Sequence, residues 1–461
     1  MSTETVHTQN PSAATAGARI QRFSDYKSRL SHAERAVAKL EAKIRRLREA
    51  GRNYKAAQFE RLLLRSHSLA IVAADTAAKK LNRKQRRNLR RSGTRDDVLQ
   101  PGPTKADVRR TADRVNLWAA SQEEVRETML PKATGWRHIY SFGLDHRTRQ
   151  EMVRRVIAAR GDLHDAQRSA RGGGLEGVSR DVCEALRSGY NYAVLLDIQN
   201  FYPSIGREVL ATRLKMPARV VDANMSPENF NVRTSLVGDN AQGRGSTPLD
   251  GMTMFRMRSS RANGYRRGLP QGSAASSIIA EAIMKDLVQA LPQGVVAFSW
   301  CDDILVLTRT RTDADLSVAR IRAAAAANPA GPFGFKRVQI RRVQDGFDFL
   351  GMRFRRRVRH PLVKPTDQRR IEFLREVEAR CGVLYITGKG IERDRAFVRS
   401  WCATCFGWED APVFCELLLA KLEWALSRHL HRRQLAARRR EVQPVAPATN
   451  STGRRRQRAD S

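Results

Sequence analysis

The stretch Tyr192–Ile205, YAVLLDIQNFYPSI, runs from an apolar segment into a single acidic residue. Ala193–Leu196 has the apolar character of a buried strand, and it leads directly into Asp197. A carboxylate at the end of a buried strand costs free energy unless it is paired or binds a metal. The alternative is an aspartate that caps the following helix, and this segment alone does not decide between the two.

A second acidic segment lies further along the chain, where Val295–Thr308 reads VVAFSWCDDILVLT. Apolar residues flank Asp302 and Asp303 on both sides, which predicts a strand–turn–strand hairpin with two acids at its tip. Adjacent carboxylates raise each other's proton affinity unless a cation screens them. A divalent metal does this and gains hard oxygen ligands. Because an ordinary hairpin would use Asn-Gly or Asp-Gly at the turn, the two acids favour a metal site.

Asp197 and Asp302 together supply what two-metal phosphoryl transfer needs, namely carboxylates from two strands of one sheet. In that mechanism two Mg²⁺ ions about 4 Å apart activate an attacking hydroxyl and stabilise the leaving pyrophosphate. Between the acids, Gly268–Ser277 reads GLPQGSAASS and predicts a turn that opens a helix. Its backbone N–H groups and Gln271 could face a nucleotide or a base pair. As an isolated string it would be an ordinary helix start.

The composition indicates an anionic partner. Lys and Arg number 84 against 47 Asp and Glu in 461 residues, a formal charge of +37 with a pI near 11.2. Such an excess repels itself unless an anion screens it, and nucleic acid is the usual partner through phosphate contacts and counterion release. A merely solvated charged surface is the alternative, but the basic residues cluster instead of alternating with acids.

The sequence also disfavours membrane, secreted and disulfide-rich proteins. The longest apolar runs, such as Leu69–Ala77, are far shorter than the about 18 residues that a membrane span needs, and the polar N-terminus has no apolar signal region. Six cysteines in 461 residues do not make a disulfide scaffold. We therefore expect a soluble, reduced, cytoplasmic protein with no membrane partner.

Hydrophobic periodicity and composition divide the chain into segments. Apolar spacings of three and four from Leu30 to Leu47, and again from Phe59 towards Ala77, predict two helices that could form a basic hairpin. The basic run Asn82–Arg95, followed by two prolines, is interpreted as a linker. The expected organisation is a disordered N-terminus at 1–20, a basic helical hairpin at 21–80, a basic linker at 81–115, a mixed α and β core at 116–365, a helical region at 366–440, and a disordered basic tail at 441–461.

Three segments match motifs A, B and C of reverse transcriptases in order and rough spacing: DIQNFYPSI from Asp197, GLPQGSAAS from Gly268, and the two acids after Cys301. The chain resembles a prokaryotic reverse transcriptase over about residues 115–440. Upstream, Pro131–Ile139, PKATGWRHI, resembles the fingers hairpin of that family, and Arg149 and Gln150 follow it. Downstream, Phe347–Phe354, FDFLGMRF, resembles the hairpin that grips the primer.

The resemblance implies an α+β right-hand polymerase fold. Fingers and palm would cover 116–365, the palm being an antiparallel sheet backed by helices, with a helical thumb after it and an N-terminal helical extension before it. Two Mg²⁺ ions, with Mn²⁺ as a substitute, would be held by Asp197, Asp302, Asp303 and the backbone carbonyl of Ile198. The other implied roles are a triphosphate clamp of Lys132 and Arg137, a nucleotide pocket with Tyr202, Gln271 and Gly272, a motif D lysine at Lys336, and a primer grip of Phe349, Leu350, Gly351 and Met352.

Tyr202 stands five residues after Asp197, where this family places an aromatic gate against the ribose 2′-OH. A bulky ring there selects dNTPs, and simple packing is the alternative role for Tyr202. Trp300 and Cys301 depart from the Tyr or Phe and Ala that usually precede the two acids. By elimination among the family's subgroups, the chain most resembles free-standing enzymes of the abortive-infection or unassigned bacterial type, many of which are linked to phage defence. Retron-like and group II intron-like enzymes are the alternatives.

The expected function is RNA-directed DNA polymerisation, with an RNA template, an RNA–DNA hybrid and dNTPs as partners and a cognate non-coding RNA as a further one. Template-independent or protein-primed DNA synthesis is one alternative, and a non-catalytic RNA-binding protein with a degenerate palm is another. Cys402 and Cys405 form a CxxC pair near Cys381 and Cys415. A zinc site is one interpretation of these cysteines, and buried thiols that pack as small apolar groups are the favoured one.

Overall fold

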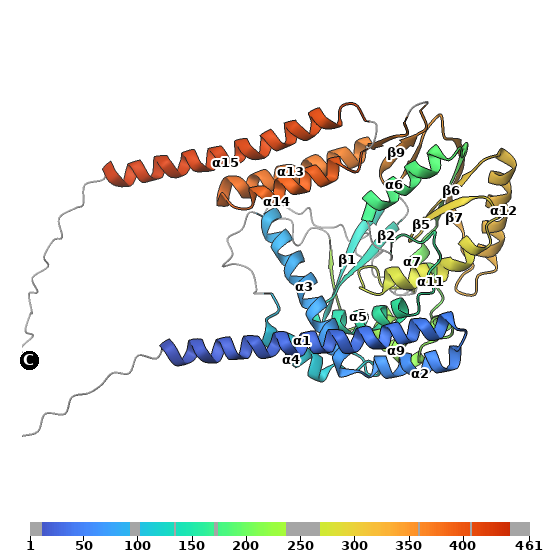
Figure 1. Cartoon of the computed structure of the whole chain (residues 1–461), viewed down its shortest axis with the longest axis horizontal. Coiled ribbons are helices and arrows are strands. Elements are labelled where there is room, and N and C mark those ends of the chain that lie inside the picture. The colour runs from blue at the N-terminus through green and yellow to red at the C-terminus, as the bar shows by residue number, and fades with distance from the viewer. Residues whose placement is uncertain are drawn as a thin grey trace, which may run out of the picture.

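The computed structural model describes residues 12–92, 102–132, 135–169, 174–236, 268–357, 360–405 and 408–442. A four-stranded antiparallel sheet of order β5-β6-β3-β7 lies at its centre (Figure 1). The strands are β3 (Tyr192–Ile198), β5 (Val296–Trp300), β6 (Asp303–Thr308) and β7 (Phe335–Arg342).

Both faces of this sheet are covered, which explains why β3 has consecutive apolar residues at positions 193–196. Val194 and Leu196 contribute to a core that also includes residues of α11 (Ser276–Gln289), α12 (Arg311–Ala326) and α5 (Leu144–Ala159). Ala193 and Leu195 point to the opposite core, which contains residues of α6 (Gly174–Arg187), β8 (Phe347–Phe349), β9 (Met352–Arg355) and β10 (Leu362–Pro365). Side chains alternate across a strand, so a strand buried on both faces needs apolar residues at consecutive positions.

A second sheet has the order β2-β1-β4. β1 (Val125–Lys132) and β2 (Gly135–Ser141) are antiparallel, and β4 (Val232–Leu236) runs parallel to β1. Glu127 on β1 is buried, and it contacts His138 Nδ1 at 2.8 Å and accepts a hydrogen bond from Thr234 Oγ1 at 2.8 Å. These contacts join all three strands. The short helices α7 (Phe201–Ser204), α8 (Arg207–Arg213), α9 (Ala218–Met225) and η2 (Pro227–Asn229) lie between β3 and β4 in the chain.

The N-terminal helices differ from the sequence prediction in three ways. α1 (Ser12–Glu49) begins inside the segment expected to be disordered, of which residues 1–11 lie outside the described part. In place of the second expected helix the structure has two, α2 (Asn53–Leu64) and α3 (His67–Ser92). The helix is interrupted at Arg65 and Ser66. There the Ser66 hydroxyl accepts a hydrogen bond from the Leu69 N–H at 3.4 Å, which caps the start of α3.

The third difference is the expected linker at 81–115, which is largely helical. α3 continues to Ser92, and α4 (Lys105–Arg114) follows it. Lys and Arg are good helix formers, and the extension is tied to neighbouring segments: Asn82 Nδ2 donates to the Pro103 carbonyl at 3.2 Å, and Lys84 Nζ donates to Ser141 Oγ at 3.5 Å. The basic run is therefore a helix surface for as far as the structure describes it.

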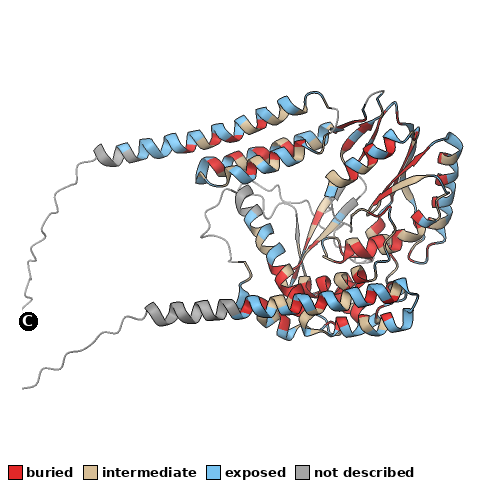
Figure 2. Ribbon diagram, in the orientation of Figure 1, coloured by how far each residue is buried: buried red, intermediate tan, exposed pale blue. Residues whose placement is uncertain are grey.

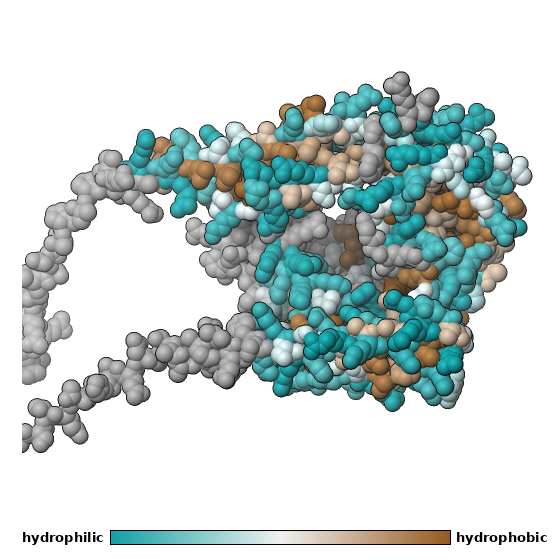
Figure 3. Space-filling model, in the orientation of Figure 1, coloured by the Kyte–Doolittle hydropathy of each residue, from teal (hydrophilic) through white to brown (hydrophobic). Residues whose placement is uncertain are grey.

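The helical region after β10 consists of α13 (Asp367–Thr387), α14 (Ile391–Cys402) and α15 (Ala411–Val442). Its separate core includes Phe373 stacked on Trp401 with ring centroids 3.7 Å apart. Buried positions follow one side of α13 and α15, whereas much of α15 is exposed (Figure 2), and Figure 3 shows apolar patches among the mostly hydrophilic surface of this layer. The predicted tail lies outside the described residues from 443 onward. In the described part of the chain, no helix combines the length and the apolar character that crossing a bilayer requires.

Candidate active site

Strand register brings the three predicted acids to one edge of the central sheet. Asp197 on β3 and Asp303 on β6 are directly opposite each other. The Ile198 N–H donates to the Asp302 carbonyl at 3.2 Å, so Asp302 lies beside the end of β3. Cys301, in the turn between β5 and β6, has a φ of +55°, a left-handed conformation that is uncommon for a residue with a side chain. The turn that presents Asp302 and Asp303 is therefore tight and conformationally unusual.

Two basic side chains of β7 face these carboxylates. Lys336 Nζ is 3.8 Å from Asp197 Oδ2, and its side chain is otherwise exposed. Arg337 Nη2 is 3.6 Å from Asp303 Oδ1. The sequence prediction included Lys336 and missed Arg337, although Arg337 is its immediate neighbour. The register of β3 against β7, which pairs Arg337 with Asp197 next to a bulge, is what directs both residues to the acidic edge.

The carboxylates destabilise one another in their charged form. Burial, followed by the nearby charges of Asp302 and Asp197, raises the pKa of Asp303 to about 6, while Arg337 and Lys336 act in the opposite direction. A cation between these oxygens would remove that repulsion. The donor set fits Mg²⁺, which usually takes one or two carboxylates and completes its shell with water and substrate phosphates. Among the described residues, no three His, Cys, Asp or Glu side chains form a ready-made metal cluster.

We expect the stabilisation of this protein by Mg²⁺ to depend on pH. The pKa of Asp303 lies above that of an unfolded aspartate, so its contribution favours the folded state below about pH 4 and is lost as the pH rises through 6. A cation that needs the ionised carboxylate offsets this loss above pH 6. The increase in Tm on adding MgCl2, relative to NaCl at equal ionic strength, should be larger at pH 7.5 than at pH 5.0.

Asp303→Asn supplies the control for this pH effect, because it removes the titrating group but keeps the side-chain volume. The variant should show a smaller difference between the two pH values, with shifts of about 1–2 °C expected for a half-exposed site. Equal Mg²⁺-induced shifts at both pH values in the unmodified protein would contradict a role for this carboxylate in cation binding. Differential scanning fluorimetry measures the Tm of both proteins at each pH value in each salt.

Tyr202 lies on the short helix α7, next to the acidic turn. Asn200, which precedes the helix, has a φ of +48°. The Tyr202 hydroxyl is hydrogen-bonded to the Cys301 thiol, and burial, followed by the effects of Cys301 and Asp302, raises the pKa of this phenol. The ring of Tyr202 also meets that of Phe201 edge-on, with centroids 5.7 Å apart. Tyr202 is therefore a neutral, positioned ring whose location is tied to the turn that carries Asp302.

The Gly268–Ser277 segment is fastened to both neighbouring elements by backbone hydrogen bonds. The Leu269 N–H donates to the Tyr202 carbonyl at 2.9 Å, and the Tyr140 N–H of β2 donates to the Gln271 carbonyl at 2.8 Å. Gln150 of α5 is buried, and its Oε1 accepts a hydrogen bond from the Ala274 N–H at 3.1 Å. This segment therefore joins α7 to the β1–β2 sheet, which places Gln271 and Gly272 between the two.

Gly272 permits this close approach. Its φ is +106°, and a Cβ at this position would lie 2.2 Å from the Tyr140 carbonyl oxygen. We expect Gly272→Ala to lower the free energy of unfolding by about 3 kcal/mol, because backbone strain and a steric clash add. Gly294→Ala is the matched control: its φ of +81° is also strained, but no atom lies within 4 Å of the added Cβ. That variant should lower the free energy of unfolding by about 1 kcal/mol. If urea unfolding gave equal losses for both variants, the steric clash at Gly272 would be contradicted.

The two hairpins expected to contact substrate are formed, and they differ in what they expose. In the β1–β2 hairpin, Arg137 is exposed opposite Leu130, whereas the Lys132 side chain lies outside the described part. In the β8–β9 hairpin, Leu350 and Gly351 occupy the turn with φ values of +51° and +77°. Phe349 and Met352 are buried in the core beneath the sheet, so their side chains pack the protein and leave the turn itself as the accessible part.

The β8–β9 turn also fixes the start of the C-terminal helices. The Gly351 carbonyl accepts hydrogen bonds from the Thr366 N–H at 3.0 Å and the Thr366 hydroxyl at 3.1 Å. Thr366 is the N-cap of α13, and its hydroxyl accepts a hydrogen bond from the Arg369 N–H. Thr366 therefore connects the β8–β9 turn to the first turn of α13.

A buried polar cluster behind the acidic turn was missed by the sequence prediction. Glu281 of α11 is fully buried, and its carboxylate accepts hydrogen bonds from the Ser169 hydroxyl and N–H and from the Cys301 N–H. Gln167 Nε2 donates to the backbone carbonyl of Glu281. Burial raises the pKa of Glu281 to about 7. These bonds support the turn from the side opposite the solvent, and a lone glutamate in an amphipathic sequence gives no sign of such a role.

The cysteines of the C-terminal helices pack among apolar side chains. Cys381 and Cys402 are buried in the core that contains Phe373 and Trp401, and all four nearby cysteines are free thiols. Burial raises the pKa of Cys402, and it raises the pKa of Cys405 to about 11. Without a bound metal, Cys402 and Cys405 are therefore protonated thiols at neutral pH.

Comparison with known proteins finds one family model that covers this site. Residues 130–354 match the family model described as reverse transcriptase (RNA-dependent DNA polymerase), just under half of the chain. The match contains Asp197, Asp302 and Asp303 together with the turns of the β1–β2 and β8–β9 hairpins. No curated protein sequence matches the chain.

Solved structures of telomerase are among those similar to this one. One is telomerase from Candida albicans in complex with a fragment of telomeric RNA, at 12% identity and a TM-score of 0.35, covering 71% of this chain and 65% of that one. Another is telomerase from Candida tropicalis without ligand, at 12% identity and a TM-score of 0.32, covering 54% and 56% of the two chains. This chain thus covers less than two thirds of either telomerase. The family match thus places the acidic edge in a region of the chain, residues 130–354, that is similar to reverse transcriptases.

Proposed function

We propose that this protein extends the 3′ end of a primer with dNTPs on an RNA template. The observation that carries the proposal is the acidic edge of the central sheet, where Asp197 and Asp303 are paired across two strands and Asp302 lies beside them. The fingers, palm and thumb of a right-hand polymerase would correspond to the β1–β2 sheet, the central sheet and α13–α15. The family match supports this assignment of function, and the charge of +37 fits a nucleic-acid partner.

Asp197 and Asp302 would hold the two Mg²⁺ ions, with Asp303 and the Ile198 carbonyl completing the donor set. When bound, such ions lower the pKa of the attacking hydroxyl and neutralise the leaving pyrophosphate. Lys336, exposed and 3.8 Å from Asp197, is placed to donate a proton or a hydrogen bond to a phosphate oxygen. Arg137 on the edge of the β1–β2 hairpin would bind the triphosphate through its guanidinium.

Tyr202 would select the sugar of the incoming nucleotide. Its ring lies beside the acidic turn, and its hydroxyl is occupied by the Cys301 thiol. A ring fixed in this way cannot easily rotate to make room for a ribose 2′-OH, whereas deoxyribose presents only hydrogen there. The turn of the β8–β9 hairpin, at Leu350 and Gly351, would contact the primer strand.

The experiment that tests the proposal is primer extension on a defined RNA template with Mg²⁺ and labelled dNTPs. We expect a DNA product complementary to the template. A product whose sequence is independent of the template would instead support template-independent synthesis, and growth only from a protein-linked first nucleotide would support protein priming. The cytoplasmic location, the cognate non-coding RNA and the antiviral role stay predictions from the sequence.

A further inference from the structure

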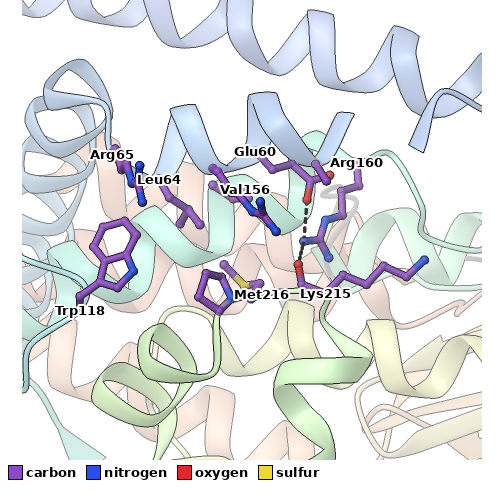
Figure 4. Close-up of a pocket in the computed structure, with 11 residues that line it drawn as sticks. Glu60, Leu64, Arg65, Trp118, Val156, Arg160, Lys215 and Met216 are labelled. Atoms are coloured by element: carbon purple, nitrogen blue, oxygen red, sulfur yellow. Dashed lines mark hydrogen bonds and ion pairs between the residues drawn. The ribbon is translucent and has the colours of Figure 1, made fainter. Parts of the chain in front are cut away.

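A cavity of about 540 Å³ lies between α2 and the segments that carry Trp118, Val156 and Met216 (Figure 4). None of its lining residues belongs to the acidic edge. One wall comes from α2, through Leu64 and Glu60, and the opposite wall comes from Met216 and Pro217, which follow α8. Trp118 closes one end, and Val156 of α5 contributes to the floor. This volume is within the range of pockets that take small organic ligands.

The lining is positively charged. Arg61, Arg65, Arg160 and Lys215 line the cavity together with one acid, Glu60. Glu60 is already committed, because it is buried and pairs with both Arg48 at 2.7 Å and Arg160 at 2.9 Å. Arg61, Arg65 and Lys215 are exposed, so they surround the entrance. The cavity therefore has an uncompensated positive field that favours an anion.

Arg160 gives the second indication of an absent ligand. Its side chain is 9% exposed, and its Nε atom is buried without a hydrogen-bond partner among the described residues. A buried guanidinium nitrogen without an acceptor is costly, and an acceptor inside the cavity would remove this cost. Its other nitrogens donate to the Leu214 carbonyl, to Glu60 and, at 3.5 Å, to the Lys215 carbonyl, which holds the side chain in place at the wall. Figure 4 shows the contacts with Glu60 and Lys215.

The apolar part of the lining suits a flat ring. Trp118 is partly exposed, and the guanidinium of Arg65 lies 5.5 Å from its ring centroid. Leu64 and Met216 line the same cavity and are buried. An indole next to arginines is a common arrangement for stacking a nucleobase while its phosphate is neutralised, and such stacking contributes about 1–3 kcal/mol per base.

We propose that this cavity binds a nucleoside phosphate, with the base against Trp118 and the phosphate towards Arg61, Arg65 and Arg160. The same chemistry can come from a free nucleotide or from a nucleotide within a single-stranded RNA. The proposal does not rest on the polymerase mechanism, because no residue of the acidic edge lines the cavity. It adds a second nucleic-acid or nucleotide site on the far side of α5 from α11.

Binding measurements on the full chain test this proposal. Isothermal titration calorimetry with AMP and GMP reports the free-nucleotide source, and fluorescence anisotropy with a labelled single-stranded RNA reports the strand source. We expect at least one of these ligands to bind, with a dissociation constant below about 1 mM for a mononucleotide. Trp118→Ala should weaken that binding about 10-fold, as loss of one stacking contact does.

Two further variants separate the cavity from general charge and from folding. Arg61→Glu should weaken binding at least about 5-fold and reduce its salt dependence, whereas Lys55→Glu, an exposed residue of the same helix outside the cavity, should change it less than about 2-fold. Ala57→Phe fills the cavity without removing a charge and should also weaken binding. Unfolding temperatures establish that each variant is folded.

The outcomes are distinguishable. Mononucleotide binding that Trp118→Ala and Ala57→Phe abolish supports the free-nucleotide source, and RNA binding that both weaken, without mononucleotide binding, supports the strand source. If folded Trp118→Ala and Ala57→Phe bind every probe as the unmodified protein does, the cavity is a packing void and the proposal is wrong. Primer extension on a saturating short template should be unaffected by Ala57→Phe, so this failure is separate from failure of the polymerase assignment.

Discussion

Asp302→Ala should lower the rate of dNTP incorporation on an RNA template at least about 10³-fold, because the substitution removes a carboxylate that we propose holds a cation at the reacting phosphate. The variant should remain folded, since Asp302 is at the solvent-accessible edge of the sheet and removing it relieves repulsion with Asp303. Single-turnover primer extension measures the rate, and the unfolding temperature measures the fold. We expect the variant to have lost dNTP incorporation while its unfolding temperature equals or slightly exceeds that of the unmodified protein.

A matched acidic control excludes a general charge effect on this prediction. Asp315 is an exposed carboxylate on α12 that pairs with Arg311 at 2.9 Å, so Asp315→Ala removes the same charge far from the proposed chemistry. Its incorporation rate should stay within about 2-fold of the unmodified protein. If Asp302→Ala retained more than a tenth of the rate, the role assigned to this carboxylate would be wrong, although the protein would still be a DNA polymerase.

Patterns within single strands allowed the central sheet and its acids to be predicted. The apolar run before Asp197 and the apolar flanks of Asp302 predict two buried strands, and strands that pair antiparallel bring their ends together. The division of the N-terminal region was harder to predict. Basic residues are typical of linkers and of exposed helix faces alike, so the run from Asn82 has no local signal that separates them, and the hydrogen bond to the Pro103 carbonyl appears only on folding.

The parts of the site that depend on distant segments could not be predicted from local patterns. Arg337 faces Asp303 because β7 pairs with β3 in one particular register, and its own sequence position does not indicate this. The sequence pattern indicates that Glu281 is a surface glutamate of a helix. In the structure it is buried, and it supports the acidic turn by accepting hydrogen bonds from Ser169 and from the Cys301 N–H. Both residues are recognised only after the segments around them are placed.

Tyr202→Ala should reduce discrimination between dNTPs and rNTPs by about 10²-fold, because the cavity left by the ring admits a hydroxyl that the ring excludes. The effect should appear as faster rNTP incorporation, with dNTP incorporation reduced less than about 10-fold. The measurement is the ratio of kcat/KM for dGTP and for GTP on the same primer and template.

Tyr202→Phe separates the ring from its hydroxyl. The hydroxyl contacts the Cys301 thiol, and the ring meets Phe201. If the ring itself excludes the 2′-OH, the phenylalanine variant should keep the discrimination of the unmodified protein to within about 3-fold. If discrimination fell equally in both variants, the hydrogen bond to Cys301 would be the selective element, acting through the position of the acidic turn. If it fell in neither, Tyr202 would serve packing alone, and the preference for deoxyribose would have to come from another residue of the nucleotide pocket.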